Sequence, residues 1–299
     1  MAEKPADFVV ETPGGRLDTY LADRIADRSR NSVQSMIRNK QVRVNGEVIA
    51  KPAFELHSGD TIRLIEIDEA TTRDSSEIAE LDILHETDDF MVINKLPGVV
   101  VHPSPGHESG TLAQAAAAYA PELRGVGEPG REGLVHRLDK NTSGLIVFAR
   151  NEATLKLLQE QFKAREVEKT YLALVDGAPP SNKGRVEAPI ARDPEHRQRF
   201  AVQASGREAV SEFATKERFK KHSLLEIHPI TGRTHQVRIH MQFLECPVVG
   251  DTVYGRRHAS LRVERQMLHA WKLVLPGHPE FEAPIPQDIN DAVRIAAVK

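Results

Sequence analysis

The residue best placed to do chemistry in this sequence is Asp139, which lies between Arg137 and Lys140 in the segment GLVHRLDKNTSGLIVFAR, residues 133–150. An apolar run follows this polar stretch, so the sequence predicts a turn that leads into a buried strand. Flanking cations, with His136 close by, favour the ionised form of a carboxylate. An ionised acid suits a nucleophile or a charge-stabilising group better than a general acid. The alternative is a turn aspartate that only bonds its own backbone.

Other chemically distinctive blocks are spread along the chain. They are Asn94-Lys95 with Pro97-Gly98 and His102-Pro103, Glu168-Lys169-Thr170-Tyr171, Thr231-Gly232-Arg233-Thr234-His235-Gln236 with Arg238 and His240, Gly250-Asp251 with Tyr254-Gly255, and Leu268-His269-Ala270. Together with His136-Arg137-Leu138-Asp139 and Ser143-Gly144-Leu145, they resemble the motifs of the RluA/RluD family of RNA pseudouridine synthases. Leu96 departs from the family pattern as an extra residue before the proline. The order of so many blocks argues against coincidence.

The resemblance implies an isomerisation, in which the glycosidic bond of a uridine in RNA breaks and the uracil is rejoined through carbon five. Such a reaction is redox-neutral, so we expect no cofactor and no metal ion. The sequence agrees, since it has neither a GxGxxG fingerprint nor a P-loop. The resemblance implies that Asp139 is the catalytic residue. Asp139 would attack the anomeric carbon, stabilise an oxocarbenium-like species or promote loss of a ribose proton, and the sequence leaves these three roles open.

Two further residues are implied as catalytic by their motif positions. Arg233 would pair with Asp139, because a guanidinium can hold a carboxylate through two hydrogen bonds and keep it ionised in a dry pocket. The alternative for Arg233 is a surface arginine on a strand. Tyr171 would stack on uracil and assist removal of the carbon-five proton. The alternative for Tyr171 is a core tyrosine at the start of a strand.

The resemblance also implies RNA contacts around these residues. A target base must leave its stack before an acid can reach its sugar, and Arg137 would fill the vacated space unless it forms a salt bridge to a neighbouring acid. His235 and His240 are five residues apart, so on a strand they would face opposite sides and would not form a metal pair. They are expected to contact RNA or to form internal hydrogen bonds. The other candidates for substrate contact are His136, Lys169 and Arg238.

Residues 15–67 are expected to form a small RNA-binding domain. Leu17, Leu21 and Ile25 fall at helical spacing, Ser32 is a plausible N-cap of a second helix, and Asn45-Gly46 predicts a tight hairpin. This order resembles the alpha-L RNA-binding domain of ribosomal and RNA-modifying proteins. Its bases are placed for phosphate contacts or, alternatively, only keep the domain soluble. They are Arg28, Arg30, Arg38, Lys40 and Arg43.

Charge and composition divide the rest of the chain. The net charge is −3, but residues 66–89 hold ten acids and one base, so the remainder is net positive. Residues 68–80 are expected to be an acidic linker and residues 81–299 the catalytic domain. Strands are predicted near residues 90–94, 145–149 and 171–175, and helices near 112–119 and 152–162. The expected fold class is α+β: a mixed, largely antiparallel catalytic sheet flanked by helices and loops, with the small N-terminal α+β domain.

The chain is expected to be a cytoplasmic monomer. Cys246 is the single cysteine, so no internal disulfide can form, and no run of residues has the length and apolarity to span a membrane. The expected partner is RNA, most of all large-subunit ribosomal RNA, because of the appended domain. The alternatives are tRNA as substrate, or a ribosome-assembly factor whose main role is not catalytic. A glycoside hydrolase would need a second opposed carboxylate, and the motif blocks offer one convincing acid.

Overall fold

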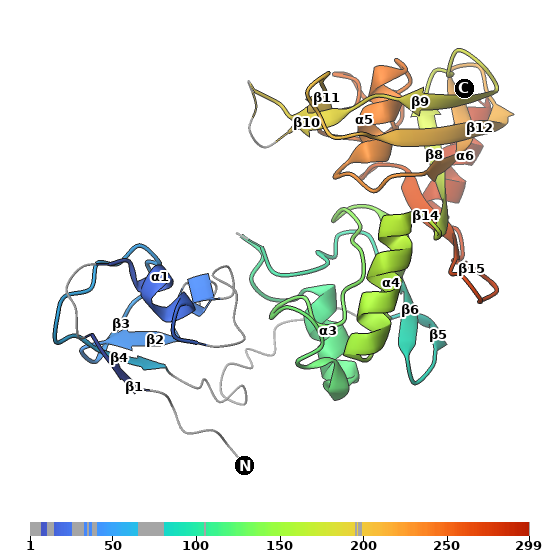
Figure 1. The fold of residues 1–299 in the computed structure, drawn as a ribbon. Coiled ribbons are helices and arrows are strands. Elements are labelled where there is room, and N and C mark those ends of the chain that lie inside the picture. The colour runs from blue at the N-terminus through green and yellow to red at the C-terminus, as the bar shows by residue number, and fades with distance from the viewer. Residues whose placement is uncertain are drawn as a thin grey trace. The chain divides into compact units, whose positions relative to one another are not determined.

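The computed structural model describes residues 7–10, 15–25, 33–34, 36–37, 41–64, 81–104, 106–194, 196 and 199–298. The chain divides into two compact units, residues 1–76 and 77–299 (Figure 1). In the part of the chain that these ranges cover, no helix has the length and apolar character of a membrane span.

The N-terminal unit is a four-stranded antiparallel sheet with helical segments packed on it. Its elements are β1 (Asp7–Val9), α1 (Leu17–Ala22), β2 (Val42–Val44), β3 (Glu47–Val48) and β4 (Thr61–Leu64), with strand order β1-β4-β2-β3. Asn45 and Gly46 have positive φ angles of 52° and 85° and form the predicted hairpin turn. Apolar side chains including Leu17, Leu21 and Ile62 form its core. Arg43 is exposed on β2, whereas Ser32, Arg28, Arg30, Arg38 and Lys40 lie outside the described residues.

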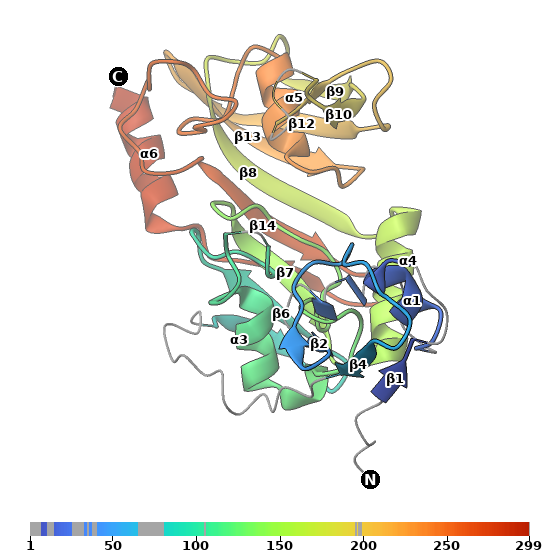
Figure 2. The same ribbon diagram turned by 90° about the vertical axis from the view of Figure 1, so that its left-hand side faces the viewer.

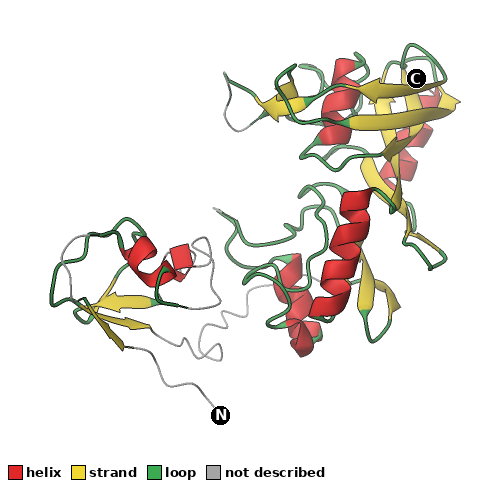
Figure 3. Cartoon of the chain, viewed as in Figure 1, coloured by secondary structure: helices red, strands yellow, loops and turns green. Residues whose placement is uncertain are grey.

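The second unit is built on a nine-stranded mixed sheet (Figures 1 and 3). Its order is β5-β6-β7-β14-β8-β13-β12-β9, with β15 paired to β14, and among these described strands only β7 and β14 pair in parallel. This confirms the α+β class with a largely antiparallel sheet. The strands are β5 (Ile83–Glu86), β6 (Phe90–Lys95), β7 (Ser143–Ala149), β8 (Glu168–Asp176), β9 (Lys183–Glu187), β12 (Val210–Arg218), β13 (His222–Pro229), β14 (Leu268–Val274) and β15 (Glu280–Glu282).

Helices cover both faces of this sheet. At one end α4 (Glu152–Ala164) packs on one face of β6 and β7, and α3 (Leu112–Tyr119) packs on the other (Figure 2). At the other end α5 (Gln236–Phe243) and α6 (Gln287–Val298) pack on opposite faces of β8. The strands are therefore buried on both sides, which explains why β6 and β7 read as unbroken apolar runs. The turn η1 (Pro121–Leu123) and a separate hairpin of β10 (Ile190–Arg192) and β11 (Phe200–Val202) complete the unit.

Candidate active site

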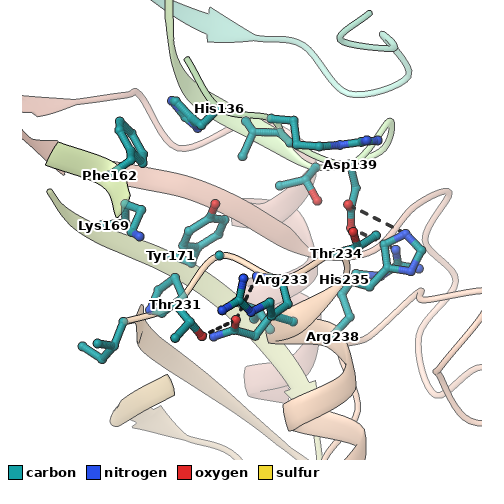
Figure 4. A pocket seen from close by; sticks show the side chains of 18 of the residues that line it. His136, Asp139, Phe162, Lys169, Tyr171, Thr231, Arg233, Thr234, His235 and Arg238 are labelled. Carbon is teal, nitrogen blue, oxygen red and sulfur yellow. Dashed lines mark hydrogen bonds and ion pairs between the residues drawn. The ribbon is translucent and has the colours of Figure 1, made fainter. Parts of the chain in front are cut away.

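A cavity of about 500 Å³ lies where the turn before β7, the end of α4, the start of β8 and the segment leading into α5 come together (Figure 4). Asp139, Tyr171 and Arg233, the three residues expected to be catalytic, all line it. The structure therefore brings together motifs that are up to about 100 residues apart in the sequence. The sheet supplies the floor, and the polar residues come from its loops and strand ends.

The turn that carries Asp139 is held from both sides. Its backbone oxygen accepts a hydrogen bond from Thr142 N at 3.1 Å. The oxygen of Lys140 accepts from Gly98 N and from the Nζ of Lys95, both at 2.9 Å. Lys95 is fully buried and also donates to the backbone oxygens of Leu96 and Val99. Because one ammonium group ties the loop after β6 to the turn after Asp139, Lys95 positions the acid without touching the cavity.

The pairing of β7 with β14 begins directly after this turn. Ser143 and Gly144 are in register with His269 and Ala270, and Ser143 Oγ lies 2.9 Å from His269 Nδ1. Gly144 has φ 110°, and a Cβ at this position would lie 2.1 Å from the carbonyl oxygen of Ala270. Only glycine fits here, so the close approach of β14 fixes the point at which the turn ends.

Asp139 is paired with Arg238 rather than with Arg233. The Nη1 of Arg238 donates to Asp139 Oδ2 at 2.9 Å, and the Asp139 side chain is 20% exposed. The expectation that Arg233 is the ion-pair partner is therefore wrong. Both arginines belong to one motif block, but only Arg238, on the first turn of α5, reaches the acid.

A second carboxylate orients Arg238. Asp251 accepts from its Nε at 2.6 Å and from its Nη2 at 2.9 Å, and both side chains are buried. Burial acts to lower the pKa of Arg238, but the hydrogen bonds and charges of Asp251 and Asp139 outweigh it and raise the pKa overall. Arg238 therefore stays charged. Asp251 is in turn held by the backbone N–H groups of Val253 and Tyr254. The late block Gly250–Gly255 thus has a role that its residue types alone did not reveal.

His235 faces the same carboxylate from the start of α5. Its Nε2 lies 3.8 Å from Asp139 Oδ1, and its Nδ1 lies 2.9 Å from Tyr254 Oη. Tyr254 Oη already accepts from Phe200 N at 3.1 Å, and we infer that it donates its own proton to Nδ1 of His235. The neutral ring then carries its proton on Nε2, towards Asp139. Burial lowers the pKa of His235, against the opposing charge of Asp139, which favours this neutral form.

The segment 233–240 is a turn and a helix, so the strand geometry considered for His235 and His240 does not apply. His235 has a left-handed backbone with φ 57° at the start of α5. His240 is buried on that helix, with Nδ1 at 2.9 Å from Ser211 Oγ and Nε2 at 3.1 Å from the oxygen of Ala188. These are internal hydrogen bonds, which is the second of the two roles expected for His240. Arg233 precedes the helix and donates from Nε to the backbone oxygen of Glu208 at 2.9 Å.

Comparison with known proteins agrees with this arrangement. The sequence profile of the family described as RNA pseudouridylate synthase matches residues 89–243. The chain belongs to the RNA pseudouridine synthase family. An S4 domain profile also matches residues 15–62 of this synthase. The resemblance drawn from the motifs is therefore confirmed, and the activity of the family is the isomerisation of uridine to pseudouridine in RNA.

Individual relatives are similar over nearly the whole synthase. It is 37% identical to an RNA pseudouridine synthase of Bacillus subtilis (strain 168) over 95% of this chain and 94% of the relative. It is 39% identical to the ribosomal large subunit pseudouridine synthase D of Xanthomonas campestris over 93% of this chain and 87% of the relative. The solved structure of human RNA pseudouridylate synthase domain containing 4 is 26% identical with a TM-score of 0.58, over 71% of this chain and 92% of that one.

Tyr171 forms part of the cavity floor of the synthase. It lies on β8 and is half-buried. Its side chain packs against two apolar clusters, one that includes residues of α3 and one that includes residues of α5. Its hydroxyl has no hydrogen-bond partner among the described residues and points into the cavity in Figure 4. Burial raises the pKa of Tyr171, and the charge of Asp139 adds to this effect. The phenol is therefore protonated at neutral pH.

His136, Phe162 and Lys169 form another side of the cavity (Figure 4). The ring of His136 stacks on Phe162 with centroids 4.6 Å apart, and its Nε2 accepts from Val147 N at 3.1 Å. Burial lowers the pKa of His136 to about 3, with a further contribution from the charge of Lys169. Burial likewise lowers the pKa of Lys169 to about 8. His136 is thus neutral, and its Nε2 serves as the acceptor for the backbone of Val147. Lys169 is a cation at neutral pH.

Arg137 lies at the mouth of the site. Its side chain is exposed and has no ion-pair partner in the ranges that the structure describes, so the alternative of a salt bridge is not observed there. Arg137 also lines a second cavity of about 320 Å³. Asp139, His235 and Arg238 line this second cavity too. In the described part of the chain, no cluster of three or more His, Cys, Asp or Glu side chains is arranged to hold a metal ion.

Proposed function

We propose that this synthase modifies uridines of large-subunit ribosomal RNA, that Asp139 is its catalytic residue, and that the target nucleotide is turned out of its stack into the cavity. The observation that carries this proposal is the Asp139–Arg238 pair at the wall of a cavity with Tyr171 in its floor. The names of several relatives, ribosomal large subunit pseudouridine synthase D, support the choice of RNA.

The size and charge of the cavity support entry of a single nucleotide. About 500 Å³ is in the range of sites that bind small ligands, whereas bases in a duplex remain stacked unless they are extruded. Seven lysine and arginine side chains line the cavity, and among the described residues Asp139 supplies its single carboxylate. This excess of cations fits a phosphate-bearing substrate, although the whole chain has a net charge of −3.

In the reaction the bond from uracil nitrogen one to the sugar breaks, and a bond from carbon five forms. Carbon five loses its proton, and nitrogen one gains one, so the atoms balance. Arg238 holds the carboxylate of Asp139 in a fixed orientation, as attack on the sugar or stabilisation of a cationic sugar requires. Tyr171 stacks on the base. The pKa of Tyr171 is raised by burial and by the charge of Asp139. If Asp139 lost its charge by forming a bond to the sugar, the pKa of the phenol would fall, and the phenol would give up its proton more readily.

The decisive experiment uses a large-subunit ribosomal transcript carrying tritium on carbon five of its uridines. Pseudouridine formation releases that tritium to water, so we expect release with the intact protein and none with Asp139→Asn. The asparagine variant should fold normally, because the substitution is isosteric. A tRNA transcript serves as the competing substrate. Lack of release from either RNA, or equal release by the two proteins, would contradict the proposal.

We further propose that residues 15–67 form an RNA-binding domain, joined by an acidic linker at 68–80 to the catalytic domain at 81–299. The S4 domain match and the separate compact unit at residues 1–76 support this division. Deletion of residues 1–76 should leave tritium release from a short RNA but weaken binding of the ribosomal transcript at low salt. Equal affinity of the full-length and truncated proteins would argue against it.

A further inference from the structure

Three arginines lie on the side of the cavity that the end of α4, the turn before β12 and the segment before α5 supply. Arg165 follows α4, Arg207 precedes β12, and Arg233 precedes α5, and all three line the cavity. None of them has a hydrogen bond or ion pair to Asp139, whose described partners are Arg238 and His235. These three positive charges are therefore not needed to hold the catalytic carboxylate.

Among the described residues, Glu208 is the acid that these arginines contact, and its carboxylate already has a partner. Both of its carboxylate oxygens accept from Arg165, and its backbone oxygen accepts from Arg233 Nε at 2.9 Å. In the part of the chain that the structure describes, the guanidinium of Arg207 and the two Nη atoms of Arg233 have no hydrogen-bond acceptor. Burial lowers the pKa of Arg233, and the charges of Arg207 and Arg165 lower it further. A bound anion would offset this repulsion between like charges.

The backbone at Arg165 has an unusual conformation for a residue with a long side chain. This residue caps α4 in a left-handed conformation, with φ 67° and ψ 26°. Glycine is the usual residue at this position, because a Cβ disfavours the left-handed region. An arginine at this position holds a disfavoured backbone conformation, and it lines the cavity.

Arg207 is also held by a specialised turn. It exchanges two backbone hydrogen bonds with Ile190, each of 2.9 Å. The preceding Gly206 lets the chains approach this closely, since a Cβ there would lie 2.6 Å from the carbonyl carbon of Ile190. The rim of the cavity thus presents Arg207 from a fixed backbone, although the side chain itself is exposed.

We propose that Arg165, Arg207 and Arg233 form a phosphate-binding subsite that holds a phosphodiester group adjoining the nucleotide inserted in the cavity. Guanidinium forks match the paired oxygens of a phosphodiester, and three forks around one anion relieve their mutual repulsion. This inference rests on the proposed function, because the ligand is the backbone of the RNA substrate. It assigns Arg233 to substrate binding and leaves Arg238 alone as the arginine that serves the catalytic acid.

The first test compares Arg165→Gly, Arg207→Gln and Arg233→Gln in the full chain on an RNA that the wild-type protein converts. Each should raise KM about 3- to 10-fold, more than it lowers kcat, because one charge-assisted contact is lost at a partly exposed site. Each should also reduce the slope of log affinity against log salt by about 0.7. Arg165→Gly should have an unchanged or higher Tm, because glycine suits the left-handed backbone.

Two controls match these changes away from the cavity. Glu245 has a left-handed φ of 60° and is exposed, so Glu245→Gly relieves the same backbone conformation without removing a cation. Arg294→Gln removes an exposed arginine of α6, whose ion pair with Asp291 lies outside both cavities. Both controls should keep the wild-type KM and salt slope. Wild-type KM and slope in the three cavity variants would overturn the subsite.

The second test neutralises the ligand. Each phosphodiester near the converted uridine is replaced in turn by an uncharged methylphosphonate. One position should weaken binding by the wild-type protein as much as Arg233→Gln does, with little further loss when the two changes are combined. Fully additive losses of affinity at every phosphate position would overturn the subsite. In that case pseudouridine formation by the wild-type protein would still uphold the proposed function. Absence of pseudouridine with the wild-type protein would instead overturn the proposed function.

Discussion

Arg238 binds two carboxylates at once: its Nη1 lies 2.9 Å from Asp139 Oδ2, and its Nε lies 2.6 Å from Asp251 Oδ2. One of these acids faces the cavity, and the other is fully buried. We therefore expect substitution of Arg238 to affect stability through the loss of its contact with Asp251, and activity through the loss of its contact with Asp139.

Arg238→Gln should lower both properties. The buried Asp251 loses its counter-ion, which should cost about 3 kcal/mol in the free energy of unfolding, and Asp139 loses its orienting donor, which should lower kcat about 100-fold or more. In the double variant Arg238→Gln with Asp251→Asn, the buried charge is removed as well. Urea unfolding should then show recovered stability, whereas tritium release should stay low. Recovery of both would mean that Arg238 acts only on the fold.

Tyr254→Phe should alter the tautomer of His235. The substitution removes the hydroxyl that lies 2.9 Å from Nδ1 and that we infer to be its donor. The ring proton would then no longer be confined to Nε2, and the N–H of Phe200 loses its acceptor. We expect changed nitrogen-15 NMR shifts of His235, a several-fold lower kcat and a loss of about 1–2 kcal/mol of stability. Tyr119→Phe is the control, because the hydroxyl of Tyr119 bonds Glu86 on the surface. Unchanged His235 shifts in Tyr254→Phe would disprove the assignment.

The charge of Lys169 should make substrate capture depend on pH. Burial lowers the pKa of Lys169 to about 8, so the free enzyme loses this cation as pH rises from about 7 to 9. The value of kcat/KM, which reports ionisation of the free enzyme, should fall over this range. Lys169→Arg should remove the fall, because a guanidinium stays charged. A matching decrease in the arginine variant would assign the titration to another group.

Acid should destabilise the fold through His136. Burial lowers the pKa of His136 from 6.5 to about 3, so between these values the unfolded chain binds more protons than the folded one. The stabilising effect of the neutral ring is complete above pH 6.5 and is lost progressively towards pH 3. From pH 7 to pH 5 the loss should be about 1–2 kcal/mol. His136→Gln, which keeps an acceptor for Val147 N, should show a smaller decrease in urea unfolding. Equal decreases would contradict this.

Part of the secondary structure could be predicted from local pattern. The apolar runs of β6 and β7 and the helical spacing in α3 and α4 were sufficient, since these elements lie where they were expected. The segment before and through α5 was not, because Val237, Ile239 and Met241 alternate with polar residues as on a strand. The structure resolves this ambiguity. Val237 and Met241 pack on the sheet, while Ile239 packs towards β10, so the helix buries two faces.

The candidate site could be predicted as a set of residues but not as a set of contacts. Asp139, Tyr171 and Arg233 do line one cavity. The choice between Arg233 and Arg238 as partner of the acid depends on where the helix begins, and no residue pattern gives that register. Arg165 and Arg207 were missed because each stands outside the motif blocks. They come to line one cavity only after α4 and the turn before β12 have packed.

The late pairing of β7 with β14 has a consequence for biosynthesis. The stretch holding Asp139 leaves the translating ribosome well before Arg238, Asp251 and the closing strand at Leu268–Val274 do. A nascent chain that ends before this strand lacks the neighbour that packs against Gly144. We therefore expect the site to become complete only late in synthesis, and a fragment that ends before Leu268 to lack activity.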